Sequence, residues 1–155
     1  KKNIDLQIKA GAEKIMIFDS GLQNMKSKFF DTKYFPILKS LANKNTAYYS
    51  RSLPRKCIST VLQAKWGGIG VDSKLDMIDC LKTVKKGFVQ GNFDEQKMLL
   101  PKYKFMYEIE RYCDDIMKSN IDTSGWVCGL GHGIDKTTPE EHVHLFIETV
   151  RNRLS

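Results

Sequence analysis

Short apolar runs alternate with amphipathic segments along the whole chain. Five runs of five or six residues each end in polar or flexible residues, at 14–19, 45–50, 68–72, 87–91 and 126–130. Continuous apolar character over such a short length is typical of strands that are buried on both faces of a parallel sheet. We therefore predict five strands at these positions.

The segments between these runs carry apolar residues at spacings of three and four, which predicts helices. These helices are expected near 25–41, from Pro54 onward, near 75–81, over 94–120 and after Thr138. Two prolines interrupt them. Pro36 should kink or split the first helix, and Pro101 should divide a short first turn from the long helix that follows.

The last helix has the clearest start signal. Thr138 is the expected N-cap, Pro139 the first helical residue, and Glu141 completes a capping box. We expect His142 and His144 to lie on the solvated flanks of this helix. Its inward-facing stripe is predicted to be Val143, Phe146, Ile147, Val150 and Leu154.

Strands that alternate with helices predict an α/β fold made of parallel β/α units. A complete TIM-type (β/α)₈ barrel typically needs about 250 residues, whereas this chain has 155. Residues 4–12 resemble the second half of a helix that leads into the first strand. We expect one domain over 1–155, either a small open sheet or about five of the eight units of a barrel whose amino-terminal portion is absent.

Composition narrows the class of protein. A content of 41% hydrophobic and 28% charged residues is that of a soluble globular chain. No apolar run approaches the roughly 18 residues that a membrane span needs. The four cysteines lack metal-site spacing and are expected to be reduced, as in a cytosol-like compartment. The net charge of +7 is spread over the helices without an aromatic platform, so we expect no nucleic-acid partner.

Polar side chains follow each predicted strand: Ser20, Arg51, Asp72, Asn92 and His132. The carboxyl ends of parallel strands are where α/β proteins bind ligands, so we expect all five at one edge of the sheet, around a cleft with a basic rim. A positive field there would concentrate a polyanionic substrate. The alternatives are that His132 only packs or caps and that Ser20 is an N-cap.

Four motifs carry a family resemblance. They are Gln7–Ala12 leading into Ile17–Ser20, then Gly70–Asp72, Gln90–Asp94 and Leu130–Ile134. In their order and spacing they resemble the carboxyl-terminal part, strands four to eight, of the uroporphyrinogen decarboxylase family. The resemblance covers essentially the whole chain.

The resemblance implies a carboxy-lyase that removes the four acetate carboxyl groups of uroporphyrinogen, a polyanionic tetrapyrrole, to give coproporphyrinogen in haem and porphyrin biosynthesis. It implies no organic cofactor and no metal, because a protonated pyrrole ring serves as the electron sink. It also implies a homodimer when complete and a cytoplasmic location, with the plastid as the alternative for a plastid-bearing source.

Three substrate-binding residues follow from the resemblance. Ser20 is expected to hydrogen-bond a substrate carboxylate, Phe18 to line the apolar wall of the cleft, and His132 to contact and orient the substrate. For Phe18 the alternative is an ordinary core aromatic. The catalytic residues are unknown, since the family's Asp and Arg belong to amino-terminal strands, and this segment alone is predicted to be inactive. The sequences at 50–53 and 72–74 depart from the family pattern.

Two other functions stay open. A zinc- and corrinoid-dependent methyltransferase would share the barrel, but its His-x-Cys signature would fall near Tyr49–Arg51, where the chain has neither residue. The second alternative is a non-catalytic half-barrel that binds a partner through its open strand edges.

Overall fold

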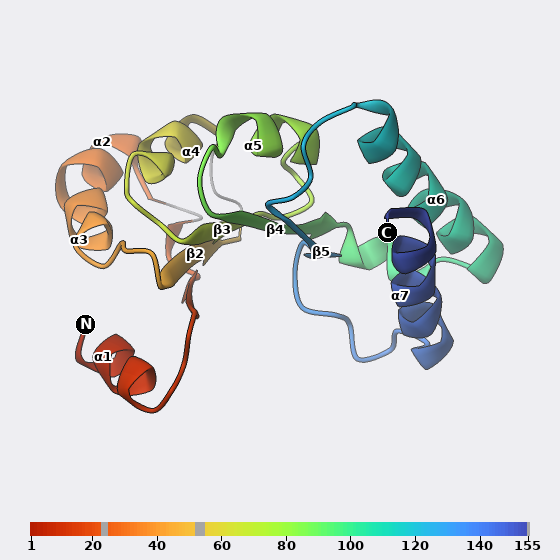
Figure 1. Ribbon diagram of the computed structural model, residues 1–155, viewed down its shortest axis with the longest axis horizontal. Helices are drawn as coiled ribbons and strands as arrows, with labels where there is room; N and C mark the ends of the chain where they lie inside the picture. The colour runs from red at the N-terminus through yellow and green to blue at the C-terminus, as the bar shows by residue number, and fades with distance from the viewer. Residues whose placement is uncertain (23–24, 52–54, 155) are drawn as a thin grey trace.

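A computed structural model of the chain describes residues 1–155 except 23–24, 52–54 and 155. All five predicted strands are present, parallel, and in the spatial order β1-β2-β3-β4-β5 (Figure 1). This is the α/β arrangement that the sequence predicts. The strands are β1 Ile15–Asp19, β2 Thr46–Ser50, β3 Gly68–Gly70, β4 Phe88–Phe93 and β5 Trp126–Leu130.

The helical segments fill the intervals between the strands. Figure 1 shows α2 to α5 over one face of the sheet, and α6 with α7 beside β5. Pro36 lies in the first turn of α3, and Pro101 precedes α6 and separates it from η3. The segments are α1 Lys2–Lys9, α2 Ser27–Phe29, the π-helical η2 Phe30–Tyr34, α3 Phe35–Lys39, α4 Arg55–Leu62, α5 Met77–Thr83, the 3₁₀-helical η3 Glu95–Leu99, α6 Lys102–Lys118 and α7 Glu140–Leu154.

Strand register defines two different faces of the sheet. Ile17, Tyr48 and Ile69 lie in one cross-strand row, and all three pack in the hydrophobic clusters under the helices. Because side chains alternate along a strand, the adjacent row of Phe18, Tyr49 and Gly70 faces the opposite side. Among the described residues no layer of helices covers that side, and Phe18 is 75% exposed there.

The core forms three clusters along the helix-covered face. One centres on Phe30 and Tyr48 beneath α2 to α4, and the next on Ile69 and Val89 beneath α5. The third lies between β5, α6 and α7 and includes Phe105. None of the four cysteines forms a disulfide. None of the helices in the described part of the chain combines the length and apolar character needed to cross a bilayer.

His142 corrects the prediction made for α7. Its ring is buried, stacks on Phe105 with 4.7 Å between centroids, and has Nδ1 2.8 Å from the Met98 carbonyl oxygen. The contact face of α7 is wider than the apolar stripe, because the helix packs against both α6 and η3. His144 is exposed, as expected, whereas Ile147 is 40% exposed and not inward-facing.

The predicted capping box is also wrong. The buried Thr138 hydroxyl has no hydrogen-bond partner in the described structure. The preceding turn is held instead by Asp135, which accepts hydrogen bonds from the Thr137 amide (2.8 Å) and hydroxyl (2.6 Å). An acidic side chain two residues before the amide makes the same local contact that an N-cap makes, and α7 begins at Glu140.

Candidate active site

The parallel topology brings the predicted strand-end residues to one edge of the sheet. Ser20 follows β1, Arg51 follows β2, and His132 follows β5 after one residue. All three are exposed. Asp72 and Asn92 belong to the same edge but are buried. The carboxyl edge therefore presents a hydroxyl, a guanidinium and an imidazole to solvent.

Gly131 is held from three directions. Its amide donates to the Phe93 carbonyl (2.7 Å), and its carbonyl accepts a hydrogen bond from the Tyr49 hydroxyl (2.8 Å). A Cβ at this position would lie 2.5 Å from the Ser73 amide nitrogen. Only glycine allows this approach of the backbone. The loop after edge strand β5 is thus fixed against the ends of β2, β3 and β4, and His132 is the next residue.

Gly70 in β3 allows Tyr49 to reach this loop. A Cβ on Gly70 would come within 2.8 Å of the Tyr49 ring, so the ring occupies the space above β3. Burial raises the pKa of the Tyr49 hydroxyl, and the nearby Asp72 carboxylate raises it further, while Arg51 opposes the shift. Tyr49 therefore remains a neutral hydrogen-bond donor to Gly131. Sequence reasoning missed this role, because it depends on a contact across three strands.

The His132 ring is exposed, and its Nδ1 lies 3.4 Å from the Gly133 carbonyl oxygen. A contact of that length is weak. The backbone before His132 is fixed while the imidazole is free to turn toward a ligand, which argues against the interpretation of His132 as a packing residue.

Asp19 anchors the end of β1 to the helical layer. Its buried carboxylate accepts hydrogen bonds from the hydroxyls of Tyr34 (2.7 Å) and Tyr48 (2.6 Å) and from the Gly21 amide (2.8 Å). Burial, followed by the bond to Asp19, raises the pKa of Tyr34 to about 12. The turn after β1 is therefore capped by Asp19, and the neighbouring Ser20 hydroxyl is exposed to solvent.

Phe18 is not a core aromatic. It projects from the face without helices and meets the Tyr49 ring edge-on, with 5.6 Å between centroids and 60° between planes. Ser20 lies just beyond the end of β1 and is also exposed. Phe18 and Ser20 therefore offer an apolar surface and a hydroxyl at the carboxyl end of the same strand.

Asn92 has an internal role. Its side-chain Nδ2 donates to the Asp72 carbonyl (3.0 Å) and to the Leu75 carbonyl. These bonds tie β4 to the loop after β3. Asn92 thus lies at the expected edge of the sheet, but these backbone carbonyls occupy its donor group. In the divergent 72–74 turn the Asp72 carboxylate accepts the Lys74 amide (3.1 Å); in the divergent 50–53 loop, residues 52 and 53 lie outside the described part.

No cluster of three or more His, Cys, Asp or Glu side chains suited to a metal occurs among the described residues. Cys128 lies in the cluster beneath α6 and α7, where burial raises the pKa of its thiol to about 12. A thiol that stays protonated is a poor zinc ligand.

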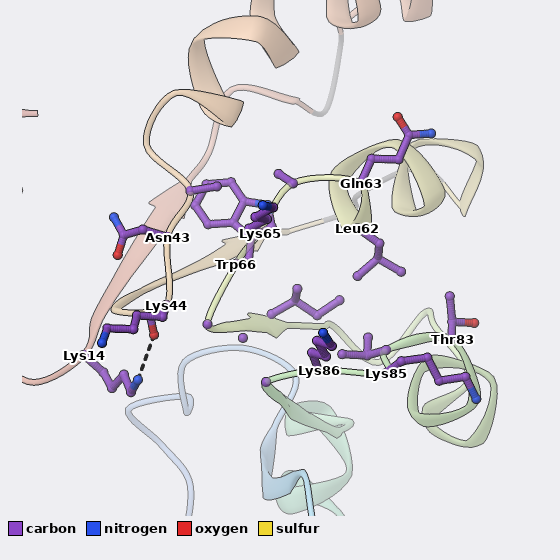
Figure 2. Close-up of a pocket in the computed structure, with 17 residues that line it drawn as sticks. Lys14, Asn43, Lys44, Leu62, Gln63, Lys65, Trp66, Thr83, Lys85 and Lys86 are labelled. Atoms are coloured by element: carbon purple, nitrogen blue, oxygen red, sulfur yellow. Dashed lines mark hydrogen bonds between the residues drawn. The ribbon is translucent and has the colours of Figure 1, made fainter.

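A large hollow lined by lysines lies at the amino ends of the strands, the opposite edge of the sheet from His132. It measures about 940 Å³ and is bounded by the loops that lead into β1 to β4 (Figure 2). The basic rim expected around the carboxyl ends is thus found at the amino ends.

The chain is similar to proteins of one family over nearly its whole length. The family model described as Uroporphyrinogen decarboxylase (URO-D) matches residues 1–153. Uroporphyrinogen decarboxylases of Salmonella dublin and Hydrogenobaculum are 29% and 31% identical to the chain over 98% and 96% of its length, which is 44% of each relative. A methyltransferase from Methanosarcina mazei has a similar fold, with a TM-score of 0.76 at 20% identity over 96% of this chain and 44% of its own.

Proposed function

The chain belongs to the uroporphyrinogen decarboxylase family, and from that premise we propose that it forms the carboxyl-terminal part of an enzyme that converts uroporphyrinogen to coproporphyrinogen. The chain spans less than half the length of the curated relatives it matches. The observation that carries the proposal is the fixed Gly131, which brings His132 to the edge where Phe18 and Ser20 are exposed.

The proposed reaction needs little beyond binding and proton delivery. Protonation of a pyrrole carbon produces an iminium-like cation next to an acetate group. The bond between the methylene and the carboxylate then breaks, CO₂ leaves, and its electron pair returns to the ring. A second proton then adds to the exocyclic methylene to give a methyl group, and the ring carbon loses the proton that it first gained, which restores the pyrrole. The protein must hold the substrate carboxylates, stabilise the cation and deliver protons.

The described residues suit part of this task. The Ser20 hydroxyl can donate to a substrate carboxylate, and the exposed Phe18 ring can pack against the macrocycle. His132 can orient a carboxylate or a water molecule. The family's Asp, which would face the cationic ring, and its Arg residues would come from strands outside these 155 residues. Those strands would pair with the free edges of β1 and β5 and cover the open face of the sheet.

Three further properties belong to the same proposal. The complete protein would be a carboxy-lyase of the porphyrin pathway, would act as a homodimer, and would be cytoplasmic, or plastidic in a plastid-bearing source. This 155-residue segment alone would not decarboxylate the substrate.

The test is the product distribution formed from uroporphyrinogen by the full-length protein, resolved by the number of remaining carboxylates. His132→Asn keeps a hydrogen-bonding head but cannot exchange a proton near neutral pH. We expect turnover to fall about tenfold, with partly decarboxylated products accumulating. Loss of a general acid would have a larger effect, because general acid catalysis contributes about 10²- to 10⁴-fold. The control is His144→Asn, which alters an exposed imidazole on α7.

Two results would contradict the proposed role. A loss beyond roughly a thousandfold would identify His132 as the proton donor. Unchanged turnover and product distribution would exclude contact between His132 and the substrate. Absence of any decarboxylation by the full-length wild type would reject the proposed function itself.

A further inference from the structure

A second concave surface lies at the amino ends of the strands, opposite the candidate active site. This hollow of about 940 Å³ draws its walls from the loops before β1, β2, β3 and β4 (Figure 2). No Asp or Glu is among its lining residues. Its basic residues are Lys14, Lys44, Lys65, Lys85 and Lys86.

These lysines are dispersed in the sequence, and closely packed loops bring them together. A Cβ on Gly67 would lie 2.2 Å from the Lys44 carbonyl oxygen, and one on Gly87 would lie 2.4 Å from the Gly67 carbonyl oxygen. Backbone bonds from Gly67 to Thr46 (2.8 Å) and from Phe88 to Gly67 (3.2 Å) join the same loops. The glycines therefore fix the spacing of the basic rim before any ligand arrives.

The interior of the hollow is apolar. The Trp66 ring is 7% exposed, stacks on Tyr48 with 5.4 Å between centroids, and donates from Nε1 to the Val61 carbonyl. Leu62 and Val84 are half-buried beside it. Figure 2 shows Lys14 and Lys44 on one side of the hollow, Lys85 and Lys86 on another, and Lys65 close to Trp66. The surface thus combines an apolar floor with a positive rim.

The described residues do not neutralise the charges of the rim. In the described part of the chain, no ion pair involves any of the five lysines, although the Lys14 ammonium donates to the Lys44 carbonyl (2.7 Å). All five side chains are exposed. Several like charges around one concavity focus a positive potential and attract an anion.

We propose that this hollow, which we name the amino-edge groove, binds an extended acidic segment of a partner protein. Three strand spacings of about 4.8 Å separate β1 from β4. Four or five extended residues at about 3.3 Å each cover that distance. Because side chains of an extended peptide alternate, its carboxylates can meet the lysines while the intervening apolar residues pack on the half-buried Leu62 and Val84.

The groove suits other anionic macromolecules less well. Single-stranded nucleic acid is bound through exposed aromatic platforms, and the Trp66 ring is stacked and almost fully buried. A bilayer surface is met by helices or side chains that insert from a protruding face, whereas these lysines surround a hollow. Both classes are nevertheless included in the test.

The test measures binding of a fluorescein-labelled ten-residue peptide, with Glu at every second position and Leu or Ser between, by fluorescence anisotropy. The matched peptide has Gln in place of Glu. We expect the Glu peptide to bind, the Gln peptide to bind at least about tenfold more weakly, and the affinity to fall as salt rises above roughly 0.1 M, where the Debye length is about 10 Å.

Two double variants with equal net charge locate the site. Lys44→Glu with Lys86→Glu reverses the rim and should weaken binding at least tenfold. Lys39→Glu with Lys136→Glu changes exposed residues outside the groove and should weaken it less than about twofold to threefold. Circular dichroism and the thermal midpoint verify that each variant is folded, and Lys65→Gln provides a milder third variant that should weaken binding measurably.

Several outcomes would overturn the proposal. Equal losses in the two double variants would mean that only net charge matters. Equal affinity for the Glu and Gln peptides would exclude charge recognition. Tighter binding of a ten-residue oligothymidylate, or of phosphatidylserine vesicles, than of the Glu peptide would assign the groove to a different class of partner.

Discussion

Replacing Gly131 by alanine should destabilise the protein, because it displaces the loop that carries His132. The added methyl group would lie 2.5 Å from the Ser73 amide nitrogen and 3.1 Å from the Asp72 carbonyl carbon. Both atoms are backbone, so no side chain can turn away to make room. The β5 loop must therefore move away from β3 as a unit.

The cost has two sources. Forcing an extra methyl into a packed site costs about 1–3 kcal/mol. Movement of the loop also weakens two hydrogen bonds, from the Gly131 amide to Phe93 and from the Tyr49 hydroxyl to Gly131, each worth about 1 kcal/mol. We expect the free energy of unfolding to fall by about 2–4 kcal/mol.

The chain supplies its own control. A Cβ on Gly133 would meet no atom within 4 Å, so Gly133→Ala should leave stability within about 0.5 kcal/mol or raise it slightly through the unfolded state. Urea unfolding of both variants gives the comparison. Tyr49→Phe should cost about 1 kcal/mol alone and less when combined with Gly131→Ala, because both changes affect one hydrogen bond. Equal stability of the two alanine variants, or strict additivity with Tyr49→Phe, would refute the three-sided fixation of Gly131.

Three other changes test neighbouring features. His142→Leu leaves the Met98 carbonyl without its partner and should cost about 1–3 kcal/mol, against less than about 0.5 kcal/mol for His144→Leu; similar losses in thermal unfolding would contradict the buried contact. Thr138→Val removes a hydroxyl that lacks a partner and should be neutral or slightly stabilising, whereas a loss near 1 kcal/mol would restore it as an N-cap. The Tyr34 pKa is raised from 10.0 to about 12, so its contribution to stability is complete below pH 10 and is lost as pH rises toward 12; urea midpoints should fall less steeply over this range in Tyr34→Phe, and an unchanged slope would contradict the shift.

The strands and their order could be predicted because each depends on a local pattern. A short apolar run with a polar end identifies a strand, and parallel neighbours joined by helices leave few alternatives for their order. The effect of Pro101 is equally local, because a missing amide changes the helix where the proline lies. These features required no knowledge of contacts between distant segments.

Three of the features that were missed depend on distant segments. His142 looked solvated because helical periodicity does not show that a second element, η3, packs against its flank. The Tyr49–Gly131 bond joins residues on β2 and after β5. The lysines of the basic rim are dispersed in the sequence because they come from four separate loops, and only the close packing at Gly67 and Gly87 brings them together.

The order of the strands also bears on how the chain folds. Each strand pairs with the strand that precedes it in the sequence, and none is inserted between two that are already paired. A chain emerging from the ribosome could therefore add one β/α unit at a time to the growing edge of the sheet. Pairing between sequence neighbours closes one crossover at a time, which keeps each new contact as local as a parallel sheet allows.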